Sequence, residues 1–303
     1  LFQFSIQFKL NLRNDQDKYQ YLFRLMRSRR KIALTVAGII ILIPGAFILS
    51  VHAGLYGRLP GKKQLIDYRN ATASVVLSAE GELIGKFFSE NRTSIEYGMI
   101  PAHLEEALVA TEDVRFREHS GIDTRSLFRV IFKTILFRDS SSGGGSTITQ
   151  QLAKNMYGRR DYALFSLFLN KTREALLAQR IEKVFSKEEI LTLYLNTVAF
   201  GENLYGIEAA SQRYFSKSTP ELKREEAAVL IGMLKANTLY NPRLHPDNAL
   251  RRRNVVLRQM ERYSYLDGRM ADSLCALPLE LHYSKIDLAG PADYFMVRVR
   301  NEA

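Results

Sequence analysis

Cysteine is nearly absent from this sequence. The single cysteine among its 303 residues, Cys275, allows neither an internal disulfide nor a metal site built from several cysteines. Acidic residues are scarce at the N-terminus: residues 1–31 hold eight Lys and Arg but two Asp, a net charge of +6, whereas the remaining residues carry +5. Hydrophobic residues make up 46% of the chain and charged residues 25%, which excludes global disorder and leaves enough apolar surface for a core.

Charged side chains are also missing from Ile32–Val51. A helix of that length is about 30 Å long, enough to cross the hydrocarbon layer of a bilayer, so we expect one transmembrane helix within residues 32–57. A signal peptide would have a shorter apolar run and a clearer cleavage site, and a buried core helix would have a polar face. The sequence therefore favours a single-pass membrane anchor.

Basic residues crowd the N-terminal side of this apolar segment. By the positive-inside rule, residues 1–31 form a cytoplasmic arm and the chain after the anchor lies on the extracytoplasmic, periplasmic side of the cytoplasmic membrane. Attraction to anionic lipid headgroups explains the basic arm more simply than nucleic acid does, so we expect no nucleic-acid partner.

The pattern beyond the anchor predicts a mainly α-helical domain over residues 58–285. Short apolar runs on both sides of the turn at Ala79–Gly81 predict a small β-hairpin within Tyr68–Arg92. Helices are expected from Pro101 to Ala110 and at 147–157, 171–185, 187–195, 224–236 and 247–263. Phe116, Tyr214 and Phe215 are expected in the core.

Glu112 and Asp113 open the first segment that could carry chemistry, Thr111–Asp123. On this segment alone, a helix end with solvated charges is an equally good interpretation. His119 belongs to the same segment, and we expect a structural role for it, because a lone His in a helical motif more often packs or hydrogen-bonds than reacts.

The second segment, Gly144–Asn155, places glycines before an amphipathic helix. We expect Ser146 to be its N-cap, so that the first-turn amides and the helix dipole face an anion. The polar face of this helix suits a phosphate-bearing ligand and carries Thr147, Gln150, Gln151 and Lys154. No Gly-Lys-Ser/Thr ends the glycine run, which excludes a nucleotide P-loop. An ordinary capped helix is an equally good interpretation of this segment alone.

Lys171 and Glu174 lie three residues apart in the third segment and share a helix face. A surface ion pair of little energetic value would explain the same spacing. Two further polar and aromatic segments follow, Tyr194–Ile207 and Tyr240–Arg253.

Taken in order, these segments resemble the peptidoglycan glycosyltransferase (family 51) domain of class A penicillin-binding proteins and monofunctional transglycosylases. The resemblance covers roughly residues 110–260, and several motifs in order are more specific than any one of them. Two features depart from the family pattern: Asn170 precedes Lys171 where an Arg is usual, and the loop before Gly144 is longer. Gly290–Phe295 resembles the connection to a transpeptidase domain, so residues 286–303 are expected to begin a linker. The Lys-Thr-Gly triplet of transpeptidases is absent, so that domain is expected to be missing.

The resemblance implies a lysozyme-like, two-lobed helical fold. It also implies an enzyme that polymerises lipid II into β-1,4 glycan strands with inversion, releasing polyprenyl pyrophosphate. Glu112 is then the implied general base, and Glu174 the second catalytic carboxylate, which orients or assists at the donor pyrophosphate. The implied substrate-binding residues are Asp113, Ser146, Thr147, Gln150, Gln151, Lys154, Asn155, Lys171 and Arg173. No cofactor is expected and no dedicated metal site is recognised, while assistance by Mg²⁺ or Mn²⁺ at the pyrophosphate stays open.

The expected partners are lipid II, the growing lipid-linked glycan, membrane lipids and other cell-wall synthesis proteins. Two apolar stretches, 130–137 and 162–169, are either interfacial helices that deliver the lipid tail or ordinary core helices. Two other functions stay open: a lysozyme-like lytic enzyme and a non-catalytic cell-wall scaffold. Polymer formation from lipid II, blocked by an inhibitor of the moenomycin type, would separate them.

Overall fold

A computed structural model of the chain describes residues 27, 31, 34–36, 38–39, 42–68, 74–77, 83–87, 91–92, 94–129, 145–163 and 165–284. The chain divides into two compact units, residues 1–59 and 60–303. In the first unit residues 42–52 are helical. None of the helices in the described ranges combines the length and hydrophobicity needed to cross a bilayer. Parts of the predicted membrane segment, most of the arm 1–31 and all of the predicted linker 286–303 lie outside the described residues.

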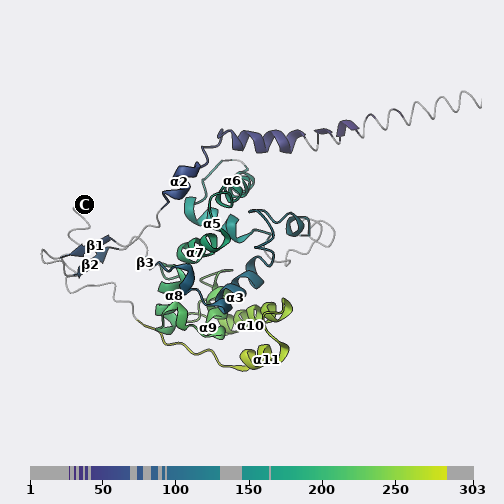
Figure 1. Cartoon of the computed structure of the whole chain (residues 1–303). Coiled ribbons are helices and arrows are strands. Elements are labelled where there is room, and N and C mark those ends of the chain that lie inside the picture. The colour runs from purple at the N-terminus through teal and green to yellow at the C-terminus, as the bar shows by residue number, and fades with distance from the viewer. Residues whose placement is uncertain are drawn as a thin grey trace, which may run out of the picture. The chain divides into compact units, whose positions relative to one another are not determined.

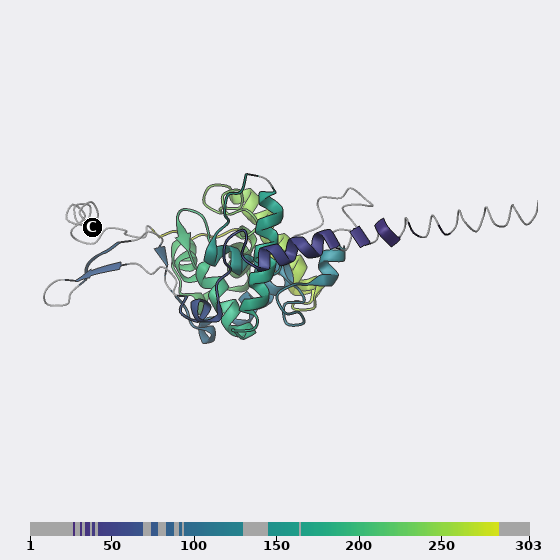
Figure 2. The same ribbon diagram turned by 90° about the horizontal axis from the view of Figure 1, so that it is seen from above.

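The second unit is mainly helical, as predicted (Figures 1 and 2). Its helices are α2 (Lys62–Ile66), η1 (Tyr97–Met99), α3 (Ala102–Glu112), α5 (Ile148–Tyr157), α6 (Ser166–Ile181), α7 (Lys187–Thr197), α8 (Ile207–Phe215), η2 (Thr219–Glu221), α9 (Arg224–Met233), α10 (Pro246–Arg262) and α11 (Gly268–Ala276). Five of the predicted helices appear within a few residues of their expected bounds, as α3, α5, α7, α9 and α10. Helix α6 begins five residues earlier than predicted, and α8 and α11 were not predicted.

Two small β pairs accompany the helices. Strands β1 (Ser74–Leu77) and β2 (Leu83–Phe87) pair antiparallel where the hairpin was predicted, and the turn between them lies outside the described residues. Strands β3 (Asn91–Arg92) and β4 (Leu204–Tyr205) pair in parallel. A two-residue strand leaves no alternation to read in a sequence, which is why the second pair was missed.

The helices of the second unit pack in two groups. Helix α5 contacts α6 and α7, whereas α3, α9 and α10 contact one another and α10 also contacts α11. Helix α8 contacts both α7 and α9, so it joins the groups. Buried apolar side chains from both groups form one core, and Phe116, Tyr214 and Phe215 belong to it, as predicted.

Helix α5 begins one residue later than the predicted cap implies. Its N-cap is Thr147, whose Oγ1 accepts a hydrogen bond from Gln150 N, while Gln150 Oε1 accepts one from Thr147 N. The prediction of Ser146 as the N-cap is therefore wrong. A Thr followed three residues later by a Gln forms a capping box, which satisfies two otherwise unpaired amides, whereas Ser146 offers no such partner. The side chain of Ser146 is consequently left for another contact.

A glycine holds the loop after α3 against α6. Gly121 has φ +90°, and a Cβ on it would lie 2.8 Å from the carbonyl carbon of Ala178. Any other residue would force the loop away from α6. Because Thr147 Oγ1 donates to Gly121 O at 2.7 Å, this close approach also fixes the start of α5 against the loop.

Candidate active site

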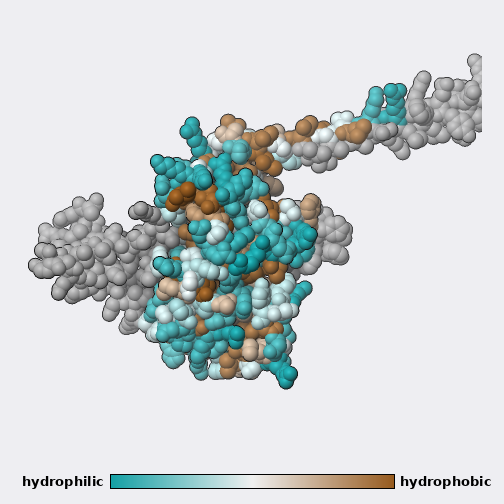
Figure 3. Space-filling view, viewed as in Figure 1, coloured by the Kyte–Doolittle hydropathy of each residue, from teal (hydrophilic) through white to brown (hydrophobic). Residues whose placement is uncertain are grey.

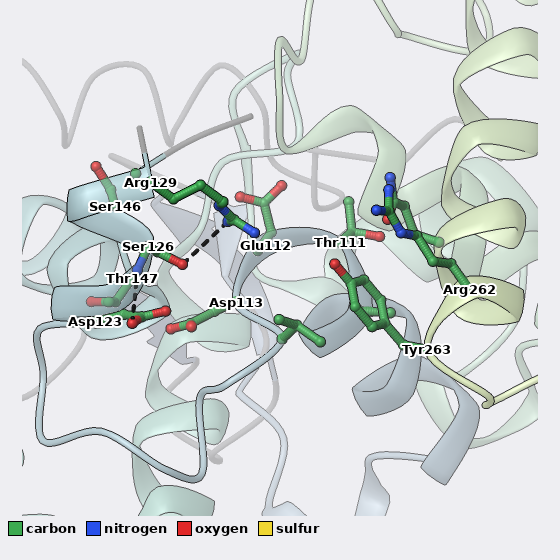
Figure 4. A pocket seen from close by; sticks show the side chains of 14 residues that line it. Thr111, Glu112, Asp113, Asp123, Ser126, Arg129, Ser146, Thr147, Arg262 and Tyr263 are labelled. Atoms are coloured by element: carbon green, nitrogen blue, oxygen red, sulfur yellow. Dashed lines mark hydrogen bonds between the residues drawn. The ribbon is translucent and has the colours of Figure 1, made fainter. Parts of the chain in front are cut away.

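Glu112 lines a cavity of about 260 Å³ that lies between the two helix groups (Figure 4). The walls come from the end of α3, the start of α5, the helical residues 124–129 and the end of α10. The polar side chains around it are Thr111, Glu112, Asp113, Asp123, Ser126, Arg129, Ser146, Thr147, Gln259, Arg262 and Tyr263. Four of the eleven predicted site residues, Glu112, Asp113, Ser146 and Thr147, thus line one cavity.

Neutral groups hold the Glu112 carboxylate. Gln151 Nε2 donates to Glu112 Oε2 at 2.8 Å, and the Tyr194 hydroxyl donates to Gln151 Oε1 at 3.0 Å. Tyr194 is fully buried, while Glu112 is half-buried at the end of α3. Burial and then the negative charge of Glu112 raise the pKa of Tyr194 well above its usual value, so the phenol stays protonated. Glu112 is therefore a carboxylate held by a neutral amide rather than by a cation, as suits a proton acceptor.

Asp113, the next residue, has both oxygens occupied by protein donors. Ile148 N donates to Asp113 Oδ2 at 3.1 Å, and His119 Nε2 lies 2.9 Å from the same oxygen and 3.1 Å from Oδ1. Gly121 N donates to His119 Nδ1, so the proton of His119 sits on Nε2 and faces Asp113. Asp113 thus provides the negative charge at the start of α5, where an anion of the ligand was expected. The expectation that these amides face a substrate anion is not met for Ile148.

The Ser146 side chain leads to a second polar cluster. Lys171 Nζ donates to Ser146 Oγ at 2.8 Å and lies 2.8 Å from Glu174 Oε2, and Arg159 Nε donates to Glu174 Oε1 at 2.8 Å. The Glu174 side chain is 6% exposed, whereas those of Lys171 and Arg159 are 42% and 44% exposed. The cluster therefore buries one carboxylate and presents two cations to solvent, an arrangement suited to a polyanionic ligand.

Asn170, where the family usually has Arg, is hydrogen-bonded to the backbone of Arg160. Its Oδ1 accepts from Arg160 N at 3.1 Å and its Nδ2 donates to Arg160 O at 2.9 Å. The amide thereby holds the segment after α5 in place, and this segment brings Arg159 into contact with Glu174. Position 170 thus lacks the positive charge of the family pattern. Arg159, a residue that the motifs did not single out, brings a positive charge to the same cluster.

Lys154 connects the two clusters electrostatically. Loss of hydration and then the positive charges of Arg159 and Lys171 lower the pKa of Lys154, while Glu174 and Glu112 act against this shift. Glu174 does not line the cavity itself. The two carboxylates therefore belong to adjoining clusters, linked by Lys154 and by the contact between Ser146 and Lys171.

The remaining predicted residues are placed differently. The pKa of Arg173 is lowered by burial and by Arg160, and Tyr162 acts against that shift, so Arg173 lies with these two groups. The side-chain nitrogen Nδ2 of Asn155 is buried and has no hydrogen-bond partner within the described part of the chain. The Gln150 side chain is engaged in the cap of α5. None of these three lines the cavity.

Several cavity residues carried no signal in the sequence. Arg262 is the last residue of α10, Tyr263 follows it as the C-cap, and Arg129 is the last of the helical residues 124–129. Their roles depend on how distant segments pack, which periodicity does not report. Within the described ranges, no group of three or more His, Cys, Asp or Glu side chains could hold a metal ion. Assistance by a divalent cation stays a prediction.

Known proteins similar to this chain point to one family. A family model described as "Transglycosylase" matches residues 80–261. Penicillin-binding protein 1A of Escherichia coli (strain K12) is 36% identical, with 90% of this chain and 31% of that protein covered. Penicillin-binding protein 1A of Aquifex aeolicus (strain VF5) is 38% identical, with 90% and 36% covered. A crystal structure of penicillin-binding protein 1A from Haemophilus influenzae aligns at a TM-score of 0.43 and 26% identity, covering 76% of this chain and 24% of that one.

The chain spans roughly a third of the length of these two relatives (31% and 36%). The family match covers more than half of the chain and includes both Glu112 and Glu174. The resemblance predicted from the motifs is confirmed: this chain belongs to the transglycosylase family, the peptidoglycan glycosyltransferases.

Proposed function

We propose that this chain polymerises lipid II, with Glu112 as the general base. The 4-hydroxyl of the acceptor sugar is a weak nucleophile at neutral pH, so a carboxylate has to remove its proton as the new β-1,4 bond forms. The observation that carries the proposal is the Glu112 carboxylate on a cavity wall, hydrogen-bonded by Gln151 rather than paired with a cation. Direct attack on the α-linked donor inverts the anomeric centre, as in inverting glycosidases with a sugar alcohol in place of water.

The leaving group needs a different environment. Polyprenyl pyrophosphate departs as an anion, so it requires positive charge rather than a proton. Lys171 and Arg159 flank Glu174, and Lys154 lies within electrostatic reach of both cations. In our proposal this cluster receives the donor pyrophosphate, with Glu174 holding the two cations at a fixed spacing. The proposed chemistry requires no cofactor, and a divalent cation would only add to the positive charge already supplied by protein.

The membrane is the second part of the proposal. Residues 32–57 would anchor the chain with the arm 1–31 in the cytoplasm and the catalytic domain outside, because Ile32–Val51 carries no charge and residues 42–52 are helical. A Cys275→Ser chain carrying Glu118→Cys should react with an impermeant maleimide added to intact spheroplasts, whereas one carrying Ser28→Cys should not. The reverse labelling pattern would overturn this topology.

A small apolar patch on the second unit would meet the lipid. Figure 3 shows a mostly hydrophilic surface over the helices, broken by small hydrophobic patches. At the start of α6, Phe165, Leu167 and Phe168 are 72%, 64% and 68% exposed. Such side chains suit the interface of a bilayer. The other apolar stretch, 130–137, lies outside the described residues. Phe165→Ser with Phe168→Ser should weaken liposome binding of residues 60–303 several-fold, and Leu239→Ser, at a 49% exposed leucine outside α6, should not.

Purified full-length chain and lipid II test the function directly. Polymer should form, should be absent in Glu112→Gln, and should be blocked by an inhibitor of the moenomycin type. Shortening of preformed glycan without polymer would indicate a lytic enzyme instead, an alternative that the family match does not favour. Failure of both reactions in a folded sample would indicate a non-catalytic scaffold.

A further inference from the structure

Tyr194 is a buried phenol whose hydroxyl needs an explanation. The residue is 0% exposed in α7, where a phenylalanine would fill the same space. Within the part of the chain that the structure describes, its hydroxyl has one hydrogen-bond partner, Gln151 Oε1 at 3.0 Å. The other end of that amide donates to Glu112 Oε2 at 2.8 Å. A hydroxyl from the core thus reaches the cavity through one side-chain amide.

We propose that Tyr194 is a positioning residue, whose hydroxyl fixes the Gln151 amide so that its N–H, and not its carbonyl, faces Glu112. This inference rests on the proposed function, in which Glu112 is the base. It goes beyond that function because Tyr194 is buried, does not line the cavity and reaches Glu112 only through the Gln151 amide.

The argument depends on how the three groups can be satisfied together. An ionised Glu112 only accepts hydrogen bonds, so Gln151 has to present Nε2 to it and keep Oε1 for the phenol to donate to. If the amide turned over, its carbonyl would face Glu112 and favour the protonated acid. Its Nε2 would then donate to Tyr194, and the buried phenol proton would have no acceptor. A buried donor left without a partner is costly, so the phenol disfavours the turned state. The arrangement therefore favours the carboxylate, the form that a base requires.

The surroundings of Glu112 contain other charges, and these set the background against which the phenol acts. The titratable and charged groups around it are Lys154 of α5, Tyr194 of α7, Arg129 of the helical residues 124–129, Arg262 at the end of α10 with Tyr263 after it, and Asp113 and Asp123 after α3. All except the phenol are unchanged by Tyr194→Phe. A change in the acid limb of the pH–rate profile in that variant therefore reports the loss of the hydroxyl.

The test compares kcat/KM for lipid II polymerisation across pH in full-length variants. Tyr194→Phe should move the acid limb upward by about one pH unit, a tenfold change in the balance of the two protonation states, and leave the plateau within a few-fold. Gln151→Met removes the donor to Glu112 and should move the limb the same way. The double variant should show no shift beyond Gln151→Met, because Tyr194 acts through Gln151.

Tyr214→Phe is the matched control. Tyr214 is also 0% exposed, and its hydroxyl donates to Phe200 O at 3.2 Å, away from the cavity. Both Tyr→Phe variants should lower Tm, but only Tyr194→Phe should shift the acid limb. An unshifted limb in Tyr194→Phe, or shifts that add in the double variant, would overturn the inference alone if Glu112→Gln is inactive. An active Glu112→Gln would instead overturn the base assignment and this inference with it.

Discussion

The two glutamates carried over from the family motifs occupy opposite kinds of environment. Glu112 is half-buried beside a cavity and accepts a hydrogen bond from an amide. Glu174 is almost fully buried and contacts two cations, Arg159 and Lys171. Two cations around a buried carboxylate suit a residue that holds charges in place, whereas a neutral donor beside a cavity suits a proton acceptor.

The difference is in line with the two roles that the family resemblance implies, a general base at Glu112 and a residue that assists at the pyrophosphate at Glu174. In our proposal one carboxylate takes up the proton, and the other fixes the positions of positive charges. Substitutions at the two positions should therefore differ in size, in pH dependence and in their effect on stability, and each difference can be measured.

Glu112→Gln is the change with the largest expected effect. The amide keeps the shape of the side chain but cannot accept the proton of the acceptor hydroxyl, so kcat/KM for lipid II should fall by about 10³-fold. Tm should change little. Glu118→Gln, an exposed carboxylate in the loop that follows, is the control and should keep full activity. Full activity in Glu112→Gln would remove the basis of the comparison.

Glu174→Gln should cost less activity and more stability. The cations Arg159 and Lys171 would stay near the pyrophosphate but lose their common anchor, so we expect a fall of about 10²-fold in kcat/KM and a lower Tm. Glu105→Gln breaks an ion pair with Arg117 and should leave polymerisation unchanged. A loss as large as that of Glu112→Gln with an unchanged Tm would mean that Glu174 takes part in the chemistry directly.

Charged groups of both clusters act on the pKa of Lys154, so the pH dependence of this residue tests the comparison. Its pKa is lowered, which means that its positive charge is lost at a lower pH than for an ordinary lysine. If that charge stabilises the leaving pyrophosphate, polymerisation should decline as pH rises through this pKa. Lys154→Arg keeps its charge at all accessible pH values and should move the alkaline limb upward by about one pH unit or more. An unchanged limb in the pH–rate profile would exclude Lys154 from this role.

Local signals in the sequence were enough to predict most helices, whereas both glutamates were named through the resemblance to the family. Ile148, Leu152 and Met156, spaced four residues apart on the apolar side of helix α5, pack in or against the core, as the helical spacing of apolar residues indicates. The cap of α5 was misplaced by one residue, since both Ser146 and Thr147 are good caps and only the reciprocal bond with Gln150 decides between them.

Contacts between distant segments could not be predicted from local sequence patterns. Arg159 approaches Glu174 because the Asn170 amide holds the backbone of Arg160, a contact that spacing along one helix cannot show. Tyr194 reaches Gln151 from a different helix. Residues whose roles arise from such packing need a structure to be recognised.

Asp123 extends the comparison to a third carboxylate, and we expect it to act on stability rather than on chemistry. It is 7% exposed, accepts from Arg115 Nε at 3.1 Å, and accepts from Ser126 N at 3.1 Å as the cap of the helical residues 124–129. Burial raises its pKa, but the bonds from Arg115 and Ser126 outweigh burial and hold the pKa well below its usual value.

A carboxyl group with a depressed folded-state pKa stabilises the protein above its unfolded-state pKa, near 3.9, and this contribution is lost as pH falls. Asp123→Asn keeps the cap and loses the ion pair, so it should lower the free energy of unfolding by about 1–2 kcal/mol at pH 7, with the difference from wild type shrinking below about pH 4. Asp123→Ala loses the cap as well and should cost about 1 kcal/mol more. Urea unfolding at several pH values measures both. Polymerisation should stay within a few-fold of wild type in Asp123→Asn; loss of activity without loss of stability would place Asp123 beside Glu112 in the chemistry.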